Sequence, residues 1–591
     1  MKTAAQLKAL LESIDRKSYP AYKETRGSYR FDGYILNIEH VQGDPFASPS
    51  KLSIAVDGAF SGFPVECYKE KHRRIALADL LLRAFGQAIS EGGRRHAGSG
   101  KSGLIIVSRP GQEILERSAL VIREKDGQVL VRFEVGFPAA GRSIRSGELI
   151  TILYDILPDI VKRTLLYRAW KKADVFRRME LADNQKCIRE SLESLGLCAF
   201  VANGAVLPRE SGVSARPMRG AVAFASPSSM SVTIPLPGGK SITGMGIRRG
   251  ITLIIGGGYH GKSTLLRAIE LGVYDHVTGD GREYVITDPT AFKIRAEDGR
   301  SIRGTDISAF ISNLPNEKDT KLFYTEDASG STSEAANVIE ALTHGSRLLL
   351  IDEDTCATNF MIRDPLMQMV VARDREPITP FLEKMRSICD DLGVSIVLVA
   401  GSQGEFFHVA DTIVQMDAYV PVDITREARR IAADYSGEKP VSDRMELEPD
   451  LRRPIRNPRM CGDRVRVKVQ GKDAFMAEHE TVDIRCLEQV VDAEQTQAIA
   501  KIIIYMHQRL FDGKKTLPEC MGIIKDSLDR EGLEFLGTER DVPCNLAMPR
   551  TAEISAAVNR CRWTKMEGRK KTWIFDGNIY VPDDFDIIEL A

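Results

Sequence analysis

Hydrophobic residues in the first 220 positions form short runs of strand type between stretches of helical periodicity. The runs occupy residues 52–56, 104–107 and 129–133. Such a mixture predicts an α+β domain over residues 1–220.

The longest helical pattern in this part lies between Tyr154 and Glu193. Apolar positions recur there at about 100° per residue, which predicts an amphipathic helix. The face expected to pack carries Leu165, Leu166, Ala169, Trp170, Ala173 and Phe176. The opposite face is basic and carries Arg168, Lys171, Lys172 and Arg178.

Strands and helices alternate from about residue 240 to residue 420, which predicts a mainly parallel sheet covered on both faces. A polar, charged stretch follows to about residue 480, and the rest of the chain is mainly helical. One helix there has an apolar stripe that we interpret as core. The stripe consists of Leu487, Val490, Val491, Ala498, Ile499, Ile502, Ile503 and Met506.

The composition excludes several classes of protein. The chain has 591 residues, of which 43% are hydrophobic and 28% charged, as in soluble globular proteins. No stretch approaches the roughly 18 apolar residues of a membrane helix, and charges interrupt the N-terminus where a signal peptide would be apolar. The ten cysteines form no C-x-x-C pair, which argues for reduced thiols. We therefore expect a cytoplasmic protein, and the net charge of −1 means that a nucleic acid would need local basic patches.

A phosphate-binding loop follows the apolar run at residues 251–255. Residues 256–264 read G-G-G-Y-H-G-K-S-T and lead into a helical pattern, which is the strand-loop-helix context of a P-loop. Inward N–H groups and the helix N-terminus favour a polyphosphate, while Lys262 reaches the β- and γ-phosphates and Ser263 can ligate Mg²⁺. The alternative interpretation is a chance glycine-rich turn.

A second G-K-S sequence lies at residues 98–102, and we reject it as a nucleotide site. Arg95 and His96 stand where the leading glycine is needed, and a strand-like run follows in place of a helix. Together with Arg94 and Lys101, this segment is a candidate basic loop for a phosphate backbone. The alternative is a solvated loop.

Two carboxylates, Asp352 and Glu353, end the apolar run at residues 348–351. A strand that ends beside the P-loop would let Asp352 hold the Mg²⁺ shell, while Glu353 orients or deprotonates the attacking water. Apolar runs ending in acids are common, but this one follows a full P-loop by about 90 residues.

A small, hydroxyl-rich turn at residues 327–334 opens a helical pattern between these two motifs. Free N–H groups at a helix start can bind an anion, although an ordinary N-capped helix gives the same pattern. The order of P-loop, Ser-Gly turn and Asp-Glu strand resembles the ATP-binding-cassette (ABC) class. The resemblance implies that Ser329 and Gly330 of one subunit close on ATP held by another, and that Asp354 lies in the loop between the two sites.

Longer sequence segments resemble one family within this class, described as predicted ATPases of the ABC class. The strings occupy residues 41–49, 242–264, 293–300, 327–332, 351–364 and 488–492. The likeness covers nearly the full chain and implies a soluble homodimer associated with nucleic acid, RNA in particular. The expected fold class is α/β. It comprises an ABC-type P-loop NTPase core (221–420) between an α+β N-terminal domain (1–220) and a mainly helical C-terminal domain (421–591).

By this resemblance, ATP and Mg²⁺ are the expected cofactors. The residues expected around ATP are Gly256, Gly257, Gly258, Tyr259, His260, Gly261, Lys262, Ser263, Thr264, Ser329, Gly330, Ser331 and Asp354. The residues expected around the metal are Ser263, Asp352, Glu297 and Asp298.

Two positions depart from transporter-type cassettes. The switch histidine is missing after the strand at 395–400, so Ser402 or Gln403 would have to sense the γ-phosphate, and hydrolysis is expected to be slow. The usual glutamine after the second core strand is also missing, and Glu297 or Asp298 could take its place.

The densest positive charge lies at residues 451–472. Alternation there places Arg464, Arg466 and Lys468 on one face of a strand, a surface that suits a phosphate backbone. The alternative is a solvated edge strand protected by its charge. No stacking aromatic cluster accompanies the basic patches, so base-specific recognition is not expected. The candidate nucleic-acid residues are Arg94, Arg95, Lys101, Arg168, Lys171, Lys172, Arg464, Arg466 and Lys468.

The leading hypothesis is a Mg²⁺-dependent ATPase whose two subunits sandwich ATP and move a surface that holds RNA. A second hypothesis is a nucleotide-dependent scaffold with negligible hydrolysis, which the missing histidine favours. The energising subunit of a membrane transporter is disfavoured by the large flanking domains and the lack of a span. A small-molecule kinase would leave the Ser-Gly turn without a role.

Overall fold

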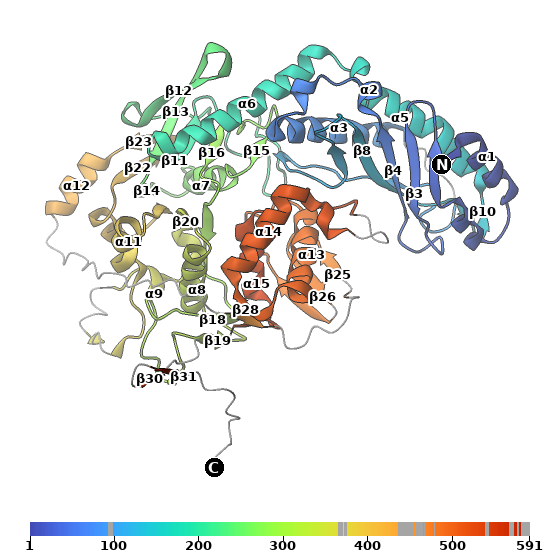
Figure 1. Cartoon of the computed structure of the whole chain (residues 1–591). Coiled ribbons are helices and arrows are strands. Elements are labelled where there is room, and N and C mark those ends of the chain that lie inside the picture. The colour runs from blue at the N-terminus through green and yellow to red at the C-terminus, as the bar shows by residue number, and fades with distance from the viewer. Residues whose placement is uncertain are drawn as a thin grey trace.

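The computed structural model describes residues 1–92, 98–364, 370–371, 375–434, 454–456, 465, 467–477, 479–537, 543–566, 573–575 and 578–580. Its N-terminal domain arches over the molecule, and the C-terminal domain lies between that domain and the P-loop core (Figure 1). Across the described ranges, the helices lack the length and apolar character needed to cross a membrane.

The N-terminal domain is built on a seven-stranded sheet. Its strands are β1 (Lys2–Thr3), β2 (Gly27–Arg30), β3 (Ile35–His40), β4 (Ser50–Val56), β5 (Ile105–Ile106), β7 (Leu120–Ile122) and β8 (Val129–Val135). They follow the order β1-β2-β3-β4-β8-β5, with β7 also paired to β8. The main helices are α1 (Ala4–Ser13), α2 (Gly58–Ser61), α3 (Lys71–Gly92), α4 (Ser146–Thr151), α5 (Leu157–Thr164) and α6 (Lys172–Ser194). Short strands β9 (Ala139–Ala140) and β10 (Ser143–Ile144) pair with each other.

The prediction of one amphipathic helix over residues 154–193 is wrong at its centre. α5 and α6 are separate helices, and a turn at Tyr167–Ala169 lies between them. Phe176, expected in the core, is 41% exposed. Arg178, expected on the basic face, is buried and pairs with Asp79 at 2.5 Å. The turn rotates the second helix out of phase with the first, so a single periodicity could not describe both.

The P-loop core contains a six-stranded sheet in the order β17-β20-β21-β14-β22-β23. These strands are β14 (Ile251–Ile255), β17 (Phe292–Ile294), β20 (Leu348–Asp352), β21 (Ser395–Val399), β22 (Thr412–Asp417) and β23 (Val420–Asp423). Every pair is parallel except β22 with β23. The helices of the core are α7 (Lys262–Leu271), α8 (Gly330–Thr343), α9 (Thr358–Met361), α11 (Phe381–Asp390) and α12 (Thr425–Asp434).

Both faces of this sheet are buried, as the alternation predicts for a parallel sheet. Leu253 packs on the face covered by α8 and α11. Its neighbour Ile254 packs on the other face, against Leu265 and Ile269 of α7. The side chains alternate because successive residues of a strand point to opposite faces.

A second, antiparallel sheet lies beside the first. It is formed by β12 (Ser231–Leu236), β13 (Lys240–Arg248), β11 (Leu197–Ala202) and β16 (Val285–Thr287) in that order. β11 comes from the segment 1–220, which the sequence assigns to the N-terminal domain. The antiparallel sheet of the P-loop core therefore includes a strand from before residue 221.

The C-terminal domain packs three helices against small sheets. The helices are α13 (Ala493–Arg509), α14 (Leu517–Glu531) and α15 (Thr551–Arg560). The strands are β24 (Pro454–Arg456), β25 (Val467–Gln470), β26 (Ala474–Ala477), β27 (Glu480–Asp483), β28 (Asp512–Thr516) and β29 (Lys565–Met566). The predicted stripe is core from Ala498 to Met506, but α13 begins only at Ala493, so Leu487, Val490 and Val491 precede the helix. Ile499 and Ile502 of α13 share one hydrophobic cluster with Ile294 and Ile351 of the P-loop core. The C-terminal domain and the P-loop core therefore share one interior.

A buried arginine also joins the N-terminal domain to the C-terminal domain. The Arg117 side chain is 2% exposed and donates to Asp492 at 2.6 Å and to Glu494 at 2.7 Å. The two carboxylates and the buried guanidinium hold the domains together tightly, because separating them would leave unpaired charges in the interior.

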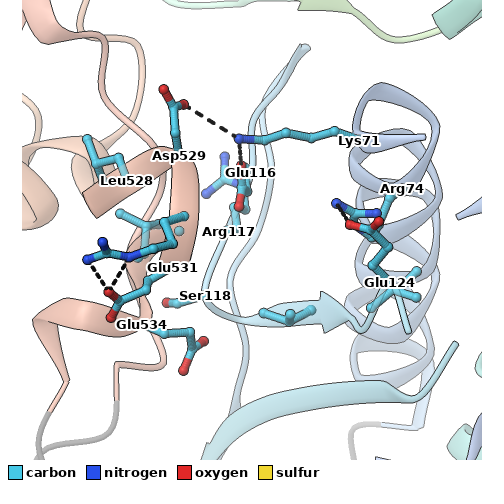
Figure 2. A pocket seen from close by; sticks show the side chains of 15 residues that line it. Lys71, Arg74, Glu116, Arg117, Ser118, Glu124, Leu528, Asp529, Glu531 and Glu534 are labelled. Atoms are coloured by element: carbon cyan, nitrogen blue, oxygen red, sulfur yellow. Dashed lines mark hydrogen bonds and ion pairs between the residues drawn. The ribbon is translucent and has the colours of Figure 1, made fainter. Parts of the chain in front are cut away.

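A cavity of about 200 Å³ lies between the same two domains, next to this contact. Figure 2 shows Lys71 of α3 extending across it towards Glu116 and Asp529, at 3.7 and 4.0 Å. Burial raises the pKa of Glu116, although Lys71 opposes this effect. The cavity is thus lined by charges from both domains.

Candidate functional site

The P-loop joins β14 to α7 at the carboxyl edge of the core sheet. The Nζ atom of Lys262 donates to the carbonyl oxygens of Gly256 and Gly257 at 2.6 and 3.0 Å, so the ammonium group lies over the loop. The Nδ1 atom of His260 accepts from the backbone N–H of Ala418 at 3.1 Å. This bond ties the loop to the turn between β22 and β23.

Two tyrosines with unusual backbone conformations stand in the P-loop and beside it. Tyr259 has φ +64° and a side chain that is 99% exposed, and Tyr419 of the β22–β23 turn has φ +74°. A Cβ built on Gly261 would lie 3.2 Å from the ring of Tyr419. Positive φ costs a non-glycine residue of order 1–3 kcal/mol and clusters at functional sites. The sequence named Tyr259 only as a loop residue and missed Tyr419, since backbone strain leaves no sequence signal.

The carboxylate pair ends β20, two strands from β14 in the sheet. Glu353 is held by the turn that follows β21: its Oε2 accepts from Gly401 N at 2.7 Å, and its Oε1 accepts from the hydroxyl of Ser402 at 2.6 Å. The structure thus brings together Glu353 and Ser402, two residues that the sequence proposed for separate roles. Gln403 does not share in this contact, and its buried Oε1 has no hydrogen-bond partner within the described structure.

The Ser-Gly turn opens α8, as the sequence predicts. Ser329 is the N-cap residue, but its hydroxyl lies 2.8 Å from the Thr332 hydroxyl and makes no capping bond to a backbone N–H. The first N–H groups of an uncapped helix favour an anion. An exposed Ser329 at the start of a 14-residue helix therefore matches an anion site better than it matches an ordinary cap.

The Ser-Gly turn lies on a different part of the sheet edge from the P-loop. Gly299, just after β17, donates its N–H to the carbonyl of Ala328 at 2.8 Å. β17 is three strands away from β14, which corresponds to about 14 Å across the sheet. The Ser-Gly turn and the P-loop are therefore attached to strands that lie about 14 Å apart in the sheet.

The structure corrects the role suggested for Glu297. Its carboxylate is buried and accepts hydrogen bonds from Arg560 of α15 and from Asn337 of α8 at 3.1 Å. The Arg560 guanidinium holds the pKa of Glu297 below its usual range, against the effect of burial. The side chain thus joins two helices and is not available to a metal. Asp298 is exposed, and its Oδ1 lies 3.3 Å from a Cβ built on Gly330, at the Ser-Gly turn.

A buried carboxylate connects the Ser-Gly helix to the loop after Glu353. Glu334 of α8 accepts from the backbone N–H of Ala357 at 2.8 Å, and its other oxygen is buried without a hydrogen-bond partner in the described structure. Burial raises the pKa of Glu334 to about 7. The sequence did not identify this residue, because nothing local distinguishes it from other helix glutamates.

The segment 488–492 anchors the C-terminal domain to the P-loop core. Glu488 accepts from Arg295, just after β17, at 2.6 Å, and it also pairs with Arg267 of α7 at 3.5 Å. Gln489, which is 2% exposed, donates to the carbonyls of Glu270 and Ala291, both at 3.1 Å. The helix that follows the P-loop is therefore tied directly to the C-terminal domain.

The candidate nucleic-acid residues are only partly gathered. Arg168, Lys171 and Lys172 lie around the start of α6, where Arg168 stacks on the Phe60 ring at 5.7 Å. In β25, Lys468 is exposed while the flanking valines pack against the core, so the predicted alternation is confirmed there. Arg94, Arg95, Arg464 and Arg466 lie outside the described residues.

The residues beside the P-loop fit a magnesium ion. The Ser263 hydroxyl is exposed on the first turn of α7, and the buried Asp352 ends β20, where its Oδ1 accepts a long bond of 3.4 Å from Asp354 N. Mg²⁺ is typically held by one or two such oxygens together with substrate phosphates. The described residues contain no cluster of three or more His, Cys, Asp or Glu that could hold a metal ion.

Comparison with known protein families gives matches over most of the chain. The ATPase of the ABC class N-terminal model matches residues 4–168, and the ABC_ATPase P-loop domain model matches residues 171–449. The MRB1590 C-terminal domain model matches residues 466–567.

One curated relative is the uncharacterized protein MJ1628 of Methanocaldococcus jannaschii, which is 34% identical over 214 residues. The match covers 33% of this chain and 47% of the relative, so the chain spans about half the length of that relative.

Two solved structures are similar over 40% of this chain. One is cbiO1 from Clostridium perfringens, part of the ABC transporter complex cbiONQ, with 14% identity, 92% of its own chain covered and a TM-score of 0.25. The other is the ADP conformation of MJ1267, an ATP-binding cassette of an ABC transporter, with 12% identity, 95% covered and a TM-score of 0.24.

Proposed function

Because the chain belongs to the ATPases of the ABC class, we propose that it is a Mg²⁺-dependent ATP hydrolase that works as a homodimer and couples ATP to the binding of RNA. The observation that carries the enzymatic part is the placement of Glu353. It lies at the carboxyl edge of the sheet that also carries the P-loop, and the 401–402 turn fixes both of its oxygens.

Each residue of the site has a distinct task in this proposal. Lys262 neutralises charge on the β- and γ-phosphates. Ser263 and Asp352 would hold Mg²⁺, which supplies electrostatic stabilisation of the phosphates. Glu353 orients the attacking water and accepts its proton. Ser402 positions Glu353 through its hydroxyl, in the place where other cassettes use a histidine.

The dimer part of the proposal follows from the spacing along the sheet edge. The Ser-Gly turn is bonded to the loop after β17, three strands from the P-loop strand β14, and Ser329 stands exposed at the start of an uncapped helix. A second copy can present this turn to the ATP of the first. Tyr259, which is strained and fully exposed beside the P-loop, is then covered by the partner subunit.

The RNA part rests on basic surfaces and on a path that connects them to the ATP site. Lys468 is exposed on β25, and Lys171 and Lys172 are exposed where α6 begins. The path runs through Glu488, which contacts both α7 and the turn after β17. Movement of α7 on nucleotide binding would therefore shift the C-terminal domain that carries β25.

A nucleotide-dependent scaffold is the second candidate, and one observation favours it. Both oxygens of Glu353 are engaged by the 401–402 turn, so the base must keep or exchange these bonds before it can accept a proton. A protein of this kind would bind ATP and dimerise with negligible turnover.

An assay of phosphate release by the purified protein, with and without total RNA, tests the proposal. We expect turnover that falls at least a hundredfold in Glu353→Gln, and RNA binding that weakens steeply as salt rises. Tight ATP binding without turnover would select the scaffold. Turnover that is unchanged in Glu353→Gln would remove this residue from its role, and RNA binding that does not depend on salt would reject the phosphate contacts.

A further inference from the structure

Two motifs of the N-terminal domain that the ATP site does not use meet on one surface. The first is V-Q-G-D-P-F-A-S-P at residues 41–49, and the second is G-S-G-K-S at residues 98–102. The backbone N–H of Lys101 donates to the carbonyl of Pro45 at 3.0 Å. A third loop, residues 136–145, packs against both of them, and we call the three together the N-terminal loop cluster.

This loop cluster is held in one conformation by a buried glutamine and by two glycines without room for a side chain. Gln42 is 1% exposed, and its Oε1 accepts from the backbone N–H groups of Ser50 and Phe137, both at 3.2 Å. A Cβ on Gly100, which has φ +63°, would lie 2.3 Å from a carbonyl oxygen of the first loop. A Cβ on Gly136 would lie 1.8 Å from a carbonyl oxygen of the second. The three loops are therefore locked together.

The loop cluster presents an aromatic ring to solvent. Phe46 is 67% exposed, although its backbone is fixed by a hydrogen bond from its own N–H to Asp44 Oδ1 at 3.0 Å. The ring lies directly beside the second loop, since a Cβ on Gly100 would approach its Cδ1 atom to 3.2 Å. Because the backbone that carries the ring is already fixed, stacking of a flat ligand on the ring orders little further chain.

The loops that carry this ring, with the turn beside them, have more cations than carboxylates. The N-terminal loop cluster and the adjoining turn at residues 14–18 carry five cations and two carboxylates in the described ranges, and a third carboxylate, Glu148, pairs with Arg145 at 2.8 Å. The cations are Arg16, Lys17, Lys101, Arg142 and Arg145. The turn is joined to the third loop by a 3.1 Å bond from Arg16 N to the carbonyl of Ile144 in β10, at the edge of the domain away from the P-loop core (Figure 1). The side chains of Arg16 and Arg142 are 91% and 82% exposed, and they pair with Asp15 at 3.7 Å and with Asp44 at 3.2 Å.

We propose that the N-terminal loop cluster binds single-stranded RNA, with an unpaired base stacked on Phe46 and the adjacent phosphates held by the surrounding cations. A base in a duplex is already stacked on its neighbours, so one exposed ring suits an unpaired base. The excess of cations matches a polyanion, and aromatic stacking beside basic residues is the usual design of single-strand binding. The inference rests on the RNA part of the proposed function and adds to it a specific site with a stacking residue.

Binding of two labelled probes by fluorescence anisotropy tests this site. One probe is an oligouridylate, and the other is an abasic oligomer with the same number of phosphates. The wild-type protein should prefer the oligouridylate. Phe46→Ala should weaken its binding about 5- to 150-fold, the loss of one base stack, and should abolish the preference over the abasic probe. Phe46→Trp should retain both the affinity for the oligouridylate and the preference over the abasic probe.

Two further variants separate stacking from charge. Lys101→Gln should weaken both probes alike and reduce the salt slope by about 0.7 for each phosphate that is no longer neutralised. Ile431→Ala, which removes an exposed apolar side chain of α12, should leave both affinities unchanged. Melting temperatures of all variants check that each one folds.

The outcomes distinguish this site from the broader RNA proposal. Oligouridylate binding that is equal in wild type and Phe46→Ala overturns the site while leaving RNA binding elsewhere on the protein intact. Equal wild-type affinity for the two probes rejects base stacking and leaves only a phosphate surface. Failure of the wild-type protein to bind either probe rejects the site together with the RNA part of the proposed function, and ATP turnover would then stand alone.

Discussion

Removing the Ser402 hydroxyl should slow ATP hydrolysis without weakening ATP binding. The perturbation is local, because Ser402→Ala deletes the donor to Glu353 Oε1 at 2.6 Å and leaves the donor from Gly401 N to Oε2 at 2.7 Å in place. The carboxylate then keeps one anchor and gains freedom to rotate. A base that samples several orientations is correctly placed for only part of the time.

The size of the effect follows from the exposure of the two partners. A hydrogen bond to a charged group contributes about 1.5–3 kcal/mol when it is buried. Ser402 is exposed and Glu353 is half-buried, so water replaces part of the interaction that the hydroxyl provided. We therefore expect about 1–1.5 kcal/mol in the activation free energy, which corresponds to a decrease in kcat of about 5- to 10-fold.

Steady-state phosphate release over a range of ATP concentrations separates kcat from KM. KM should change less than kcat, and Ser402→Thr, which keeps a hydroxyl, should recover most of the rate. In a Glu353→Gln background, Ser402→Ala should lower kcat almost no further, since the carboxylate that Ser402 positions is gone. Independent, multiplicative losses in the double variant, or a single variant as fast as wild type, would refute the positioning role.

Three further predictions concern stability and ATP binding. Burial raises the pKa of Glu334 to about 7 from the 4.5 of a free carboxyl group, so the folded state loses stability as pH rises from about 5 to 7. Glu334→Gln lacks this titration, so denaturant titrations should show its free energy of unfolding rising relative to that of wild type over this pH range, by up to about 3 kcal/mol. A difference between the two proteins that does not change with pH would contradict this prediction. Arg117→Met should lower the free energy of unfolding by about 3–5 kcal/mol, because it leaves two carboxylates unpaired. The control Arg163→Met removes a half-exposed ion pair and should lower it by less than about 1 kcal/mol. Similar losses in the two variants would exclude a special role for the buried pair. Lys262→Ala should weaken ATP binding about 10- to 150-fold by calorimetry, and unaltered affinity would mean that the lysine does not contact the phosphates.

Local motifs with a fixed geometry could be predicted from the sequence. The P-loop combines a strand, a glycine-rich turn and a helix in one continuous segment, so its conformation needs no distant contact. The placement of Asp352 at the end of a buried strand also follows from a local apolar run. The same holds for the apolar stripe from Ala498 to Met506, because helical periodicity persists through α13, whereas the first three predicted positions of the stripe precede the helix.

Features that depend on distant partners could not be predicted. Glu297 has the right residue type for a metal site, but its partner Arg560 comes from a helix 263 positions further along the chain. The break between α5 and α6 could not be predicted, because apolar positions recur at helical spacing on both sides of it. Phe46 is separated from Lys101 by more than fifty residues, so no local pattern placed an aromatic ring beside that basic loop.

Mixing two inactive variants gives the most direct test of a shared ATP site. Lys262→Ala damages the P-loop, and Ser329→Glu places a negative charge at the exposed turn that is proposed to meet the γ-phosphate of the partner. Each variant alone should have little turnover, while the mixture should regain phosphate release, because a mixed dimer contains one intact P-loop facing one intact Ser-Gly turn. Full activity of Ser329→Glu on its own, or a mixture no more active than its components, would contradict the account.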